Sequence, residues 1–136
     1  EKGVCRMARK KEMRHEEYMK TQELKDKRSK IIKTVRHLGK EDVDALHEAE
    51  QSYGDSWRQR GGVGAFMMLA RKWDRLEKQT NDFGYDIFAA INDDTRDEGI
   101  LDDIRDLRRY LLLVESHILL SWEKQGLDMN LGSQDD

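Results

Sequence analysis

The apolar positions of the chain recur at intervals of three and four residues, the spacing of one face of an α-helix. The clearest case is residues 97–124, where leucines beside the stripe widen it, which predicts burial on more than one side or in an oligomer interface. No stretch alternates polar and apolar residues as a β-strand does. The pattern predicts an all-α helical bundle of four to five helices. The stripe of its last helix consists of Ile100, Ile104, Leu107, Leu111, Val114 and Ile118.

The same spacing predicts further helices earlier in the chain. A short helix is expected over residues 31–38, ended by the glycine that follows, and another over residues 41–53. Residues 54–64 contain four glycines and predict a loop. A longer helix follows over residues 65–80, and a short one over residues 83–91. The predicted inward face of the longer helix consists of Phe66, Leu69, Ala70, Trp73 and Leu76.

Charge separates the chain into differently composed segments. Residues 1–40 carry 14 Lys and Arg against 6 Asp and Glu, a net charge of +8, whereas the remainder carries −11. We therefore expect a basic N-terminal helical extension over residues 1–30, a helical-bundle domain over 31–126, and a flexible acidic tail over 127–136. The basic arm could meet phosphates of nucleic acid or of a small ligand. Alternatively, it is a solvated helix that docks on its own acidic domain or on a partner subunit.

The composition narrows the class of protein. There is no proline, and 39% of the residues are charged, which favours long solvated helices. The single cysteine, Cys5, cannot form an intrachain disulfide, and no apolar run is long enough to span a bilayer. We expect a soluble cytoplasmic protein without a membrane partner. The sequence contains no P-loop, no dinucleotide fingerprint and no nucleophile motif, and the four histidines lack metal-ligand spacing.

Two helices each carry a pair of acidic residues three positions apart. The pairs are Asp74 with Glu77 and Asp103 with Asp106, and each pair lies at the margin of an apolar stripe. Inward carboxylates on neighbouring helices require compensation, either by cations or by arginine partners. Oxygen ligands alone select hard ions, so the first alternative is a Mg²⁺ or Mn²⁺ site. In the second alternative the acids form ordinary ion pairs with arginines.

The glycine-rich loop before the longer helix is a candidate ligand site. It contains Trp57, Arg58 and Arg60 and leads into a helix N-terminus. Two guanidinium groups and an indole at such a place are suited to hold a phosphate and to stack a base. The alternative is a loop without a ligand.

The string Asp103-Ile-Arg-Asp106-Leu-Arg-Arg-Tyr110-Leu111 resembles the second metal-binding helix of the all-α nucleoside triphosphate pyrophosphatases, the MazG and dCTP pyrophosphatase group. That helix has Glu-x-x-Asp and then an aromatic residue one turn after the Asp. Asp74-Arg-Leu-Glu77 is similar to the family's first Glu-x-x-Glu helix, with Asp in place of the first Glu. In an alternative register, Lys72 and Arg75 stand where the pyrophosphatases keep acids.

A closer resemblance is to the phage and bacterial family called nucleotide modification associated domain 1, over residues 42–120. The strings that carry it are Tyr53-Gly54-Asp55-Ser56-Trp57, Lys72-Trp73-Asp74-Arg75 and Asp103-Ile-Arg-Asp106-Leu.

The resemblance implies a Mg²⁺-dependent (or Mn²⁺-dependent) nucleotide pyrophosphohydrolase that forms dimers or tetramers in a bacterial or phage-infected cell. The implied metal and catalytic residues are Asp74, Glu77, Asp103 and Asp106. The implied ligand-binding residues are Trp57, Arg58, Arg60, Lys72, Arg75 and Tyr110. Two alternatives stay open: a non-catalytic nucleotide-binding or assembly module, and a phage accessory protein that binds nucleic acid through the basic arm.

Overall fold

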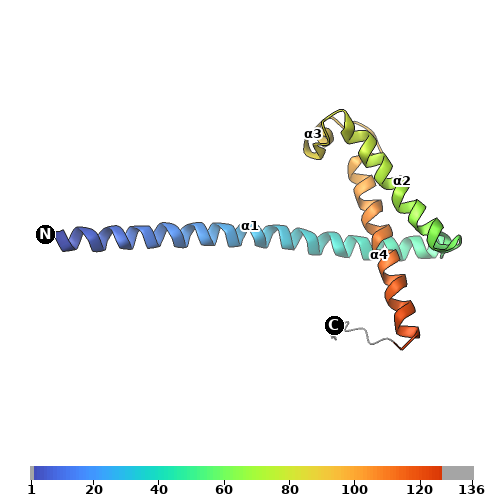
Figure 1. Cartoon of the computed structure of the whole chain (residues 1–136), viewed down its shortest axis with the longest axis horizontal. Coiled ribbons are helices and arrows are strands. Elements are labelled where there is room, and N and C mark those ends of the chain that lie inside the picture. The colour runs from blue at the N-terminus through green and yellow to red at the C-terminus, as the bar shows by residue number, and fades with distance from the viewer. Residues whose placement is uncertain (1, 127–136) are drawn as a thin grey trace. The chain divides into compact units, whose positions relative to one another are not determined.

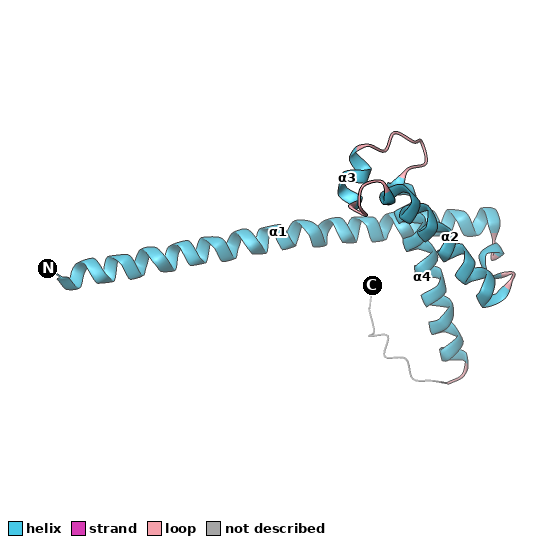
Figure 2. Cartoon of the chain, turned by 45° about the horizontal axis from the view of Figure 1, so that its top comes forward, coloured by secondary structure: helices cyan, strands magenta, loops and turns pink. Residues whose placement is uncertain are grey.

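A computed structural model describes residues 2–126, with side chains from Lys11 onward. Its elements are α1 (Lys2–Tyr53), a single 3₁₀ turn η1 (Ser56–Arg58), α2 (Gly61–Asn81), α3 (Ile87–Asn92) and α4 (Ile100–Lys124). No strand occurs among these residues (Figure 2), so the prediction of an all-α protein is confirmed. None of the described helices combines the length and the apolarity needed to cross a membrane. The expected acidic tail lies outside the described residues.

Helix α1 runs without interruption through the position where the sequence analysis expected a break. Gly39 was expected to end a helix, and this prediction is wrong: α1 continues for 14 residues to Tyr53. A glycine inside a helix costs only about 1 kcal/mol, and no proline lies nearby to enforce a stop. The chain divides into two compact units, Glu1–Ala45 and Leu46–Asp136. The expected boundary near residue 30 therefore lies inside α1.

The second unit is built on the packing of α2 against α4. The two helices lie side by side and run in opposite directions (Figure 1). Between them and the short α3 lies a small apolar cluster centred on Leu76, Ala90 and Ile100. Partly buried side chains complete this cluster: Phe83, Ile87, Ile91, Ile104 and Leu107.

The turns on either side of α3 are fixed by carboxylates. Asp86 caps α3, because its Oδ1 accepts hydrogen bonds from the backbone N–H groups of Phe88 and Ala89. Asp94 plays a similar part for α4: its Oδ2 accepts from the N–H of Ile100 at 2.6 Å, and its Oδ1 accepts from Nε of Arg96 at 2.9 Å. These contacts hold the loop before α4 onto the first turn of that helix.

The contacts of Asp94 make the stability of the fold depend on pH. The hydrogen bond from the Arg96 side chain, with that from the Ile100 N–H, lowers the pKa of Asp94 to about 2 from 3.8. Because the folded-state pKa is depressed, the stabilisation is fully present above pH 3.8 and is lost as pH falls through 2. We expect urea midpoints of the wild type to fall more steeply between those pH values than midpoints of Asp94→Asn. Parallel pH dependences of the two proteins would contradict this assignment.

The second unit leaves much of its apolar surface uncovered. Its buried apolar side chains are only Ala65, Leu76, Ala90 and Ile100 among the described residues. From the middle of α4 onward, Leu111, Ile118 and Trp122 are exposed although they share one helical stripe. Such a surface is typical of a protein–protein contact. Further large apolar side chains are exposed on this unit: Val63, Phe66, Met67, Trp73, Tyr85, Phe88, Leu101, Leu112 and Leu120.

Candidate functional site

A cluster of charged side chains joins the middle of α2 to the first turns of α4. Asp103 is only 1% exposed, and its Oδ1 lies 3.0 Å from Nε of Arg75 and 3.7 Å from Nζ of Lys72. The same Nζ of Lys72 lies 2.6 Å from Oδ2 of Asp106. Lys72 therefore bridges the two carboxylates, and the two cations offset the cost of burying Asp103.

One carboxylate oxygen of this cluster has no hydrogen-bond partner among the described residues. This atom is Oδ2 of Asp103, and it is buried. A buried carboxylate oxygen normally accepts at least one hydrogen bond, so this atom has capacity for a further donor or cation. Asp103 also lies in the first turn of α4, where the positive end of the helix dipole favours a negative charge.

The other two predicted acids are not part of this cluster. Asp74 and Glu77 are exposed, whereas Lys72 and Arg75 face α4, so the register that turned the acids inward is wrong. The physical reason is that Phe66 and Trp73 were counted as core residues, although they are 65% and 60% exposed. The stripe that packs against α4 instead includes Ala65, Leu69, Lys72, Leu76 and Thr80.

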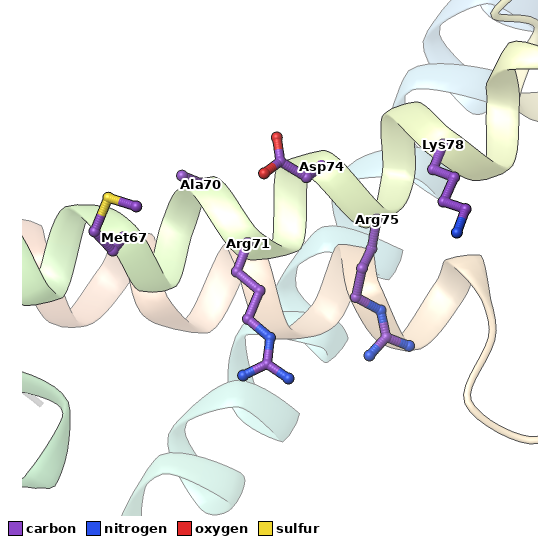
Figure 3. A pocket seen from close by; sticks show the side chains of 6 residues that line it. All are labelled: Met67, Ala70, Arg71, Asp74, Arg75 and Lys78. Carbon is purple, nitrogen blue, oxygen red and sulfur yellow. The ribbon is translucent and has the colours of Figure 1, made fainter.

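Figure 3 shows where Asp74 lies instead. Its carboxylate points to the opposite side of α2 from the side chains of Arg71 and Arg75. It lines a shallow concavity of about 290 Å³ along α2, together with Met67, Ala70, Arg71, Arg75 and Lys78. This concavity contains three cationic side chains and a single carboxylate.

The residues present do not fit a magnesium site made of four carboxylates. Only Asp103 and Asp106 come together, and the positive charge between them is supplied by Lys72. Across the described residues, no group of three or more His, Cys, Asp or Glu side chains could hold a metal ion. Hard divalent cations usually take several oxygen ligands, so two carboxylates and an ammonium group make a poor set.

A second candidate site lies farther along the same two helices. It is a cleft of about 350 Å³, a size within the lower range of small-molecule pockets. The walls are mostly apolar, with one guanidinium group and an imidazole. Its lining residues are Trp57, Arg58, Gly61, Gly62, Ala65, Phe66, Leu69, Val114, His117 and Ile118.

The polar end of this cleft is held by side chains from η1 and α4. The rings of Trp57 and His117 meet edge to face, with centroids 5.9 Å apart and planes at 89°. Nη1 of Arg58 lies 3.2 Å from Nδ1 of His117, and its Nη2 donates to the carboxylate of Asp55. The guanidinium group is thus oriented by an acid on one side and by an imidazole on the other.

The N-terminus of α2 opens at the same cleft. Gly61 and Gly62 line it, and the helix has neither a side-chain cap nor an acidic residue in its first turn. Gly61 has φ of +69°, which favours glycine, and a Cβ on Gly64 would come within 2.7 Å of Cβ of Arg60. The free N–H groups of a first helical turn, with the helix dipole, attract anions. Arg60, the residue at the N-cap, is exposed beside them.

Part of this site agrees with the sequence analysis and part was missed. Trp57 and Arg58 line the cleft as candidate ligand residues, whereas Arg60 lies just outside its lining. Tyr110 is partly buried on α4, one turn from Asp106 and one turn from Val114, and therefore lies between the charged cluster and the cleft. Phe66 and His117 also line the cleft, and neither was predicted as a ligand residue. The one sequence signal for His117 is its position two heptads after Asp103, which places both residues on one side of α4.

Comparison of the chain with protein-family models, curated proteins and solved structures finds no match. The resemblance described above therefore rests on the residues quoted for it.

Proposed function

We propose that the α2–α4 unit binds a nucleotide in the cleft beside Trp57. The single observation that carries the proposal is that one cleft combines aromatic walls with an uncapped helix N-terminus. Trp57, Phe66 and His117 offer flat surfaces to a base, and the α2 N-terminus offers N–H donors to phosphate oxygens. A nucleotide is the common ligand that has both parts.

The positions of Arg60 and Arg58 favour one orientation of the nucleotide in the cleft. Arg60 is exposed at the N-terminus of α2, and no interaction of its side chain competes for the guanidinium group among the described residues. Arg58 is held by Asp55 and His117, so it presents a fixed edge rather than a mobile charge. The base would lie against the apolar walls, and the phosphates would lie toward Arg60.

Removal of the indole should weaken nucleotide binding strongly. Base stacking on an aromatic side chain contributes about 1–3 kcal/mol, so we expect Trp57→Ala to raise the Kd for deoxynucleoside triphosphates roughly 5- to 150-fold. Isothermal titration with the four common triphosphates measures this change. Trp73→Ala is the matched control, because Trp73 is exposed on α2 and does not line the cleft.

The same titrations locate the phosphates. Affinity should rise from nucleoside to triphosphate, and Arg60→Gln should remove most of that rise. Arg71→Gln should leave it intact, because Arg71 is exposed on α2 and does not line the cleft. Equal binding by wild type and Trp57→Ala, or equal losses from Arg60→Gln and Arg71→Gln, would refute the proposed cleft.

Hydrolysis of the bound triphosphate is a second candidate function, and one observation favours it. The unpartnered Oδ2 of Asp103 lies in a buried carboxylate on the helix that resembles the metal-binding helix of the pyrophosphatases. The bridging position of Lys72 speaks against it in this arrangement. Release of pyrophosphate that requires Mg²⁺ and is lost in Asp106→Asn would support hydrolysis. Nucleotide binding without turnover would support the binding module alone.

A further inference from the structure

The segment from Lys25 to Lys40 of α1 carries a dense set of cations. It contains seven Lys and Arg residues and one acid, Asp26. Each of the seven side chains is exposed. The seven are Lys25, Lys27, Arg28, Lys30, Lys33, Arg36 and Lys40.

Five of these cations share one face of the helix. At about 100° per residue, they fall within an arc of roughly 140°, which also contains the one acid of the segment, Asp26. The apolar side chains of the segment lie outside that arc, so a partner on one face need not displace a partner on the other. The basic face consists of Lys25, Lys30, Lys33, Arg36 and Lys40, and the apolar row of Leu24, Ile31, Ile32, Val35 and Leu38.

The basic face is not neutralised within its own helix. Lys27, which lies outside the face, pairs with Glu23 at 3.4 Å, and His37 contacts Glu41 at 3.3 Å. None of the five cations of the face has an ion pair or hydrogen bond among the described residues. With Asp26, the face has a net charge of +4 along about 22 Å of helix. These cations repel one another, and an anionic partner of similar length would relieve that repulsion.

The length and the residue composition of the basic face favour duplex DNA as that partner. Duplex DNA carries one phosphate charge per about 1.7 Å of axis, and its major groove, about 12 Å wide, admits an α-helix. No Phe, Tyr or Trp occurs between Tyr18 and Tyr53, so the face offers no large aromatic ring on which unpaired bases could stack. Its one ring is the imidazole of His37, which contacts Glu41. Proteins that hold single strands normally use large aromatic rings. The face also has no Asn or Gln to read the edge of adenine.

We propose that the basic face of α1 binds the phosphate backbone of double-stranded DNA without base specificity. This inference concerns the first unit of the chain and does not depend on the nucleotide cleft of the second. It assigns a second polyanion-binding function to a protein whose net charge is −3.

Salt dependence of binding to a labelled duplex of mixed sequence tests the proposal. With five phosphate contacts, log K should fall with log salt at a slope of about −4.5, or about 500-fold in affinity between 50 and 200 mM. Lys33→Gln/Arg36→Gln removes two contacts. We expect its slope to be about −2.7 and its loss over the same range about 40-fold.

The matched control is Lys20→Gln/Lys27→Gln. It removes the same charge from the same helix, but both positions lie on the side of α1 away from the basic face. We expect the slope of this control to equal that of the wild type, with circular dichroism showing equal helicity in all three proteins.

Four results would overturn the proposal. They are no binding to the duplex at 50 mM salt, equal losses in the two variants, tighter binding to a single strand of the same length, and binding to anionic lipid vesicles in place of DNA. The last would assign the basic face and the apolar row together to a lipid surface. The first result together with salt-sensitive self-association would assign the basic face to a second copy of this chain.

Discussion

Asp103→Asn is expected to lower the free energy of unfolding by about 2–4 kcal/mol, because it leaves Arg75 and Lys72 beside a neutral amide. Asp103 is 1% exposed, while the side chains of its partners are 34% and 17% exposed. Solvent can reach the cations in part, so the loss should fall below that of a fully buried pair. Urea denaturation at a fixed protein concentration measures it.

The control for this variant lies on the other face of α2. Asp74→Asn removes a carboxylate of the same size from an exposed position and should change stability by less than about 0.5 kcal/mol. The two variants also separate two views of the charged cluster. If the acids of α2 and α4 repelled one another around a metal site, Asp103→Asn would leave the metal-free protein as stable as the wild type or more so.

The second large effect concerns assembly. We expect the wild type to be a dimer or larger at micromolar concentration, because the second unit exposes a stripe that contains Leu111 and Trp122, 50% and 46% exposed. Leu111→Glu/Trp122→Glu places two charges on this stripe and should yield monomers. Light scattering coupled to size exclusion reports the mass.

A matched pair of substitutions tests whether the α4 stripe is the contact. Tyr85 and Phe88 are also exposed but lie before and within α3, on another part of the unit. Tyr85→Glu/Phe88→Glu should keep the assembly of the wild type. A monomeric wild type, or loss of assembly in both variants alike, would contradict an interface on α4.

The helices of this protein could be predicted from sequence because their determinants are local. Residues 97–124 have a continuous three-and-four repeat, and α4 occupies Ile100–Lys124. The predicted end at Gly39 was wrong because a glycine only weakens a helix, and its neighbours on both sides favour one. The helix over residues 65–80 was predicted with a start four residues too late, because Gly61 begins α2 despite its low helix propensity.

The candidate sites were harder to predict because they depend on which face of each helix is inward. On α2, the expected inward stripe included the aromatic residues Phe66 and Trp73, which are exposed in the structure. That stripe placed acids opposite Asp103, where the structure has cations such as Lys72. Large aromatic side chains dominate a periodicity analysis whether or not they are buried. The loop around Trp57 was predicted as a ligand site on composition, but its partner His117 comes from a helix 59 residues away from Arg58. Only the three-dimensional fold identifies that pairing.

The Asp94 turn has a consequence for the order in which the second unit folds. Its hydrogen bonds join residues at most six positions apart, so they can form before any contact between α2 and α4. Once they form, residues 82–99 are a shorter effective loop, and closing it to pair the two helices costs less entropy. The ion pairs of Asp103 form only at that later step. We therefore expect substitutions at Asp94 to act mainly on the rate of folding and substitutions at Asp103 mainly on the rate of unfolding.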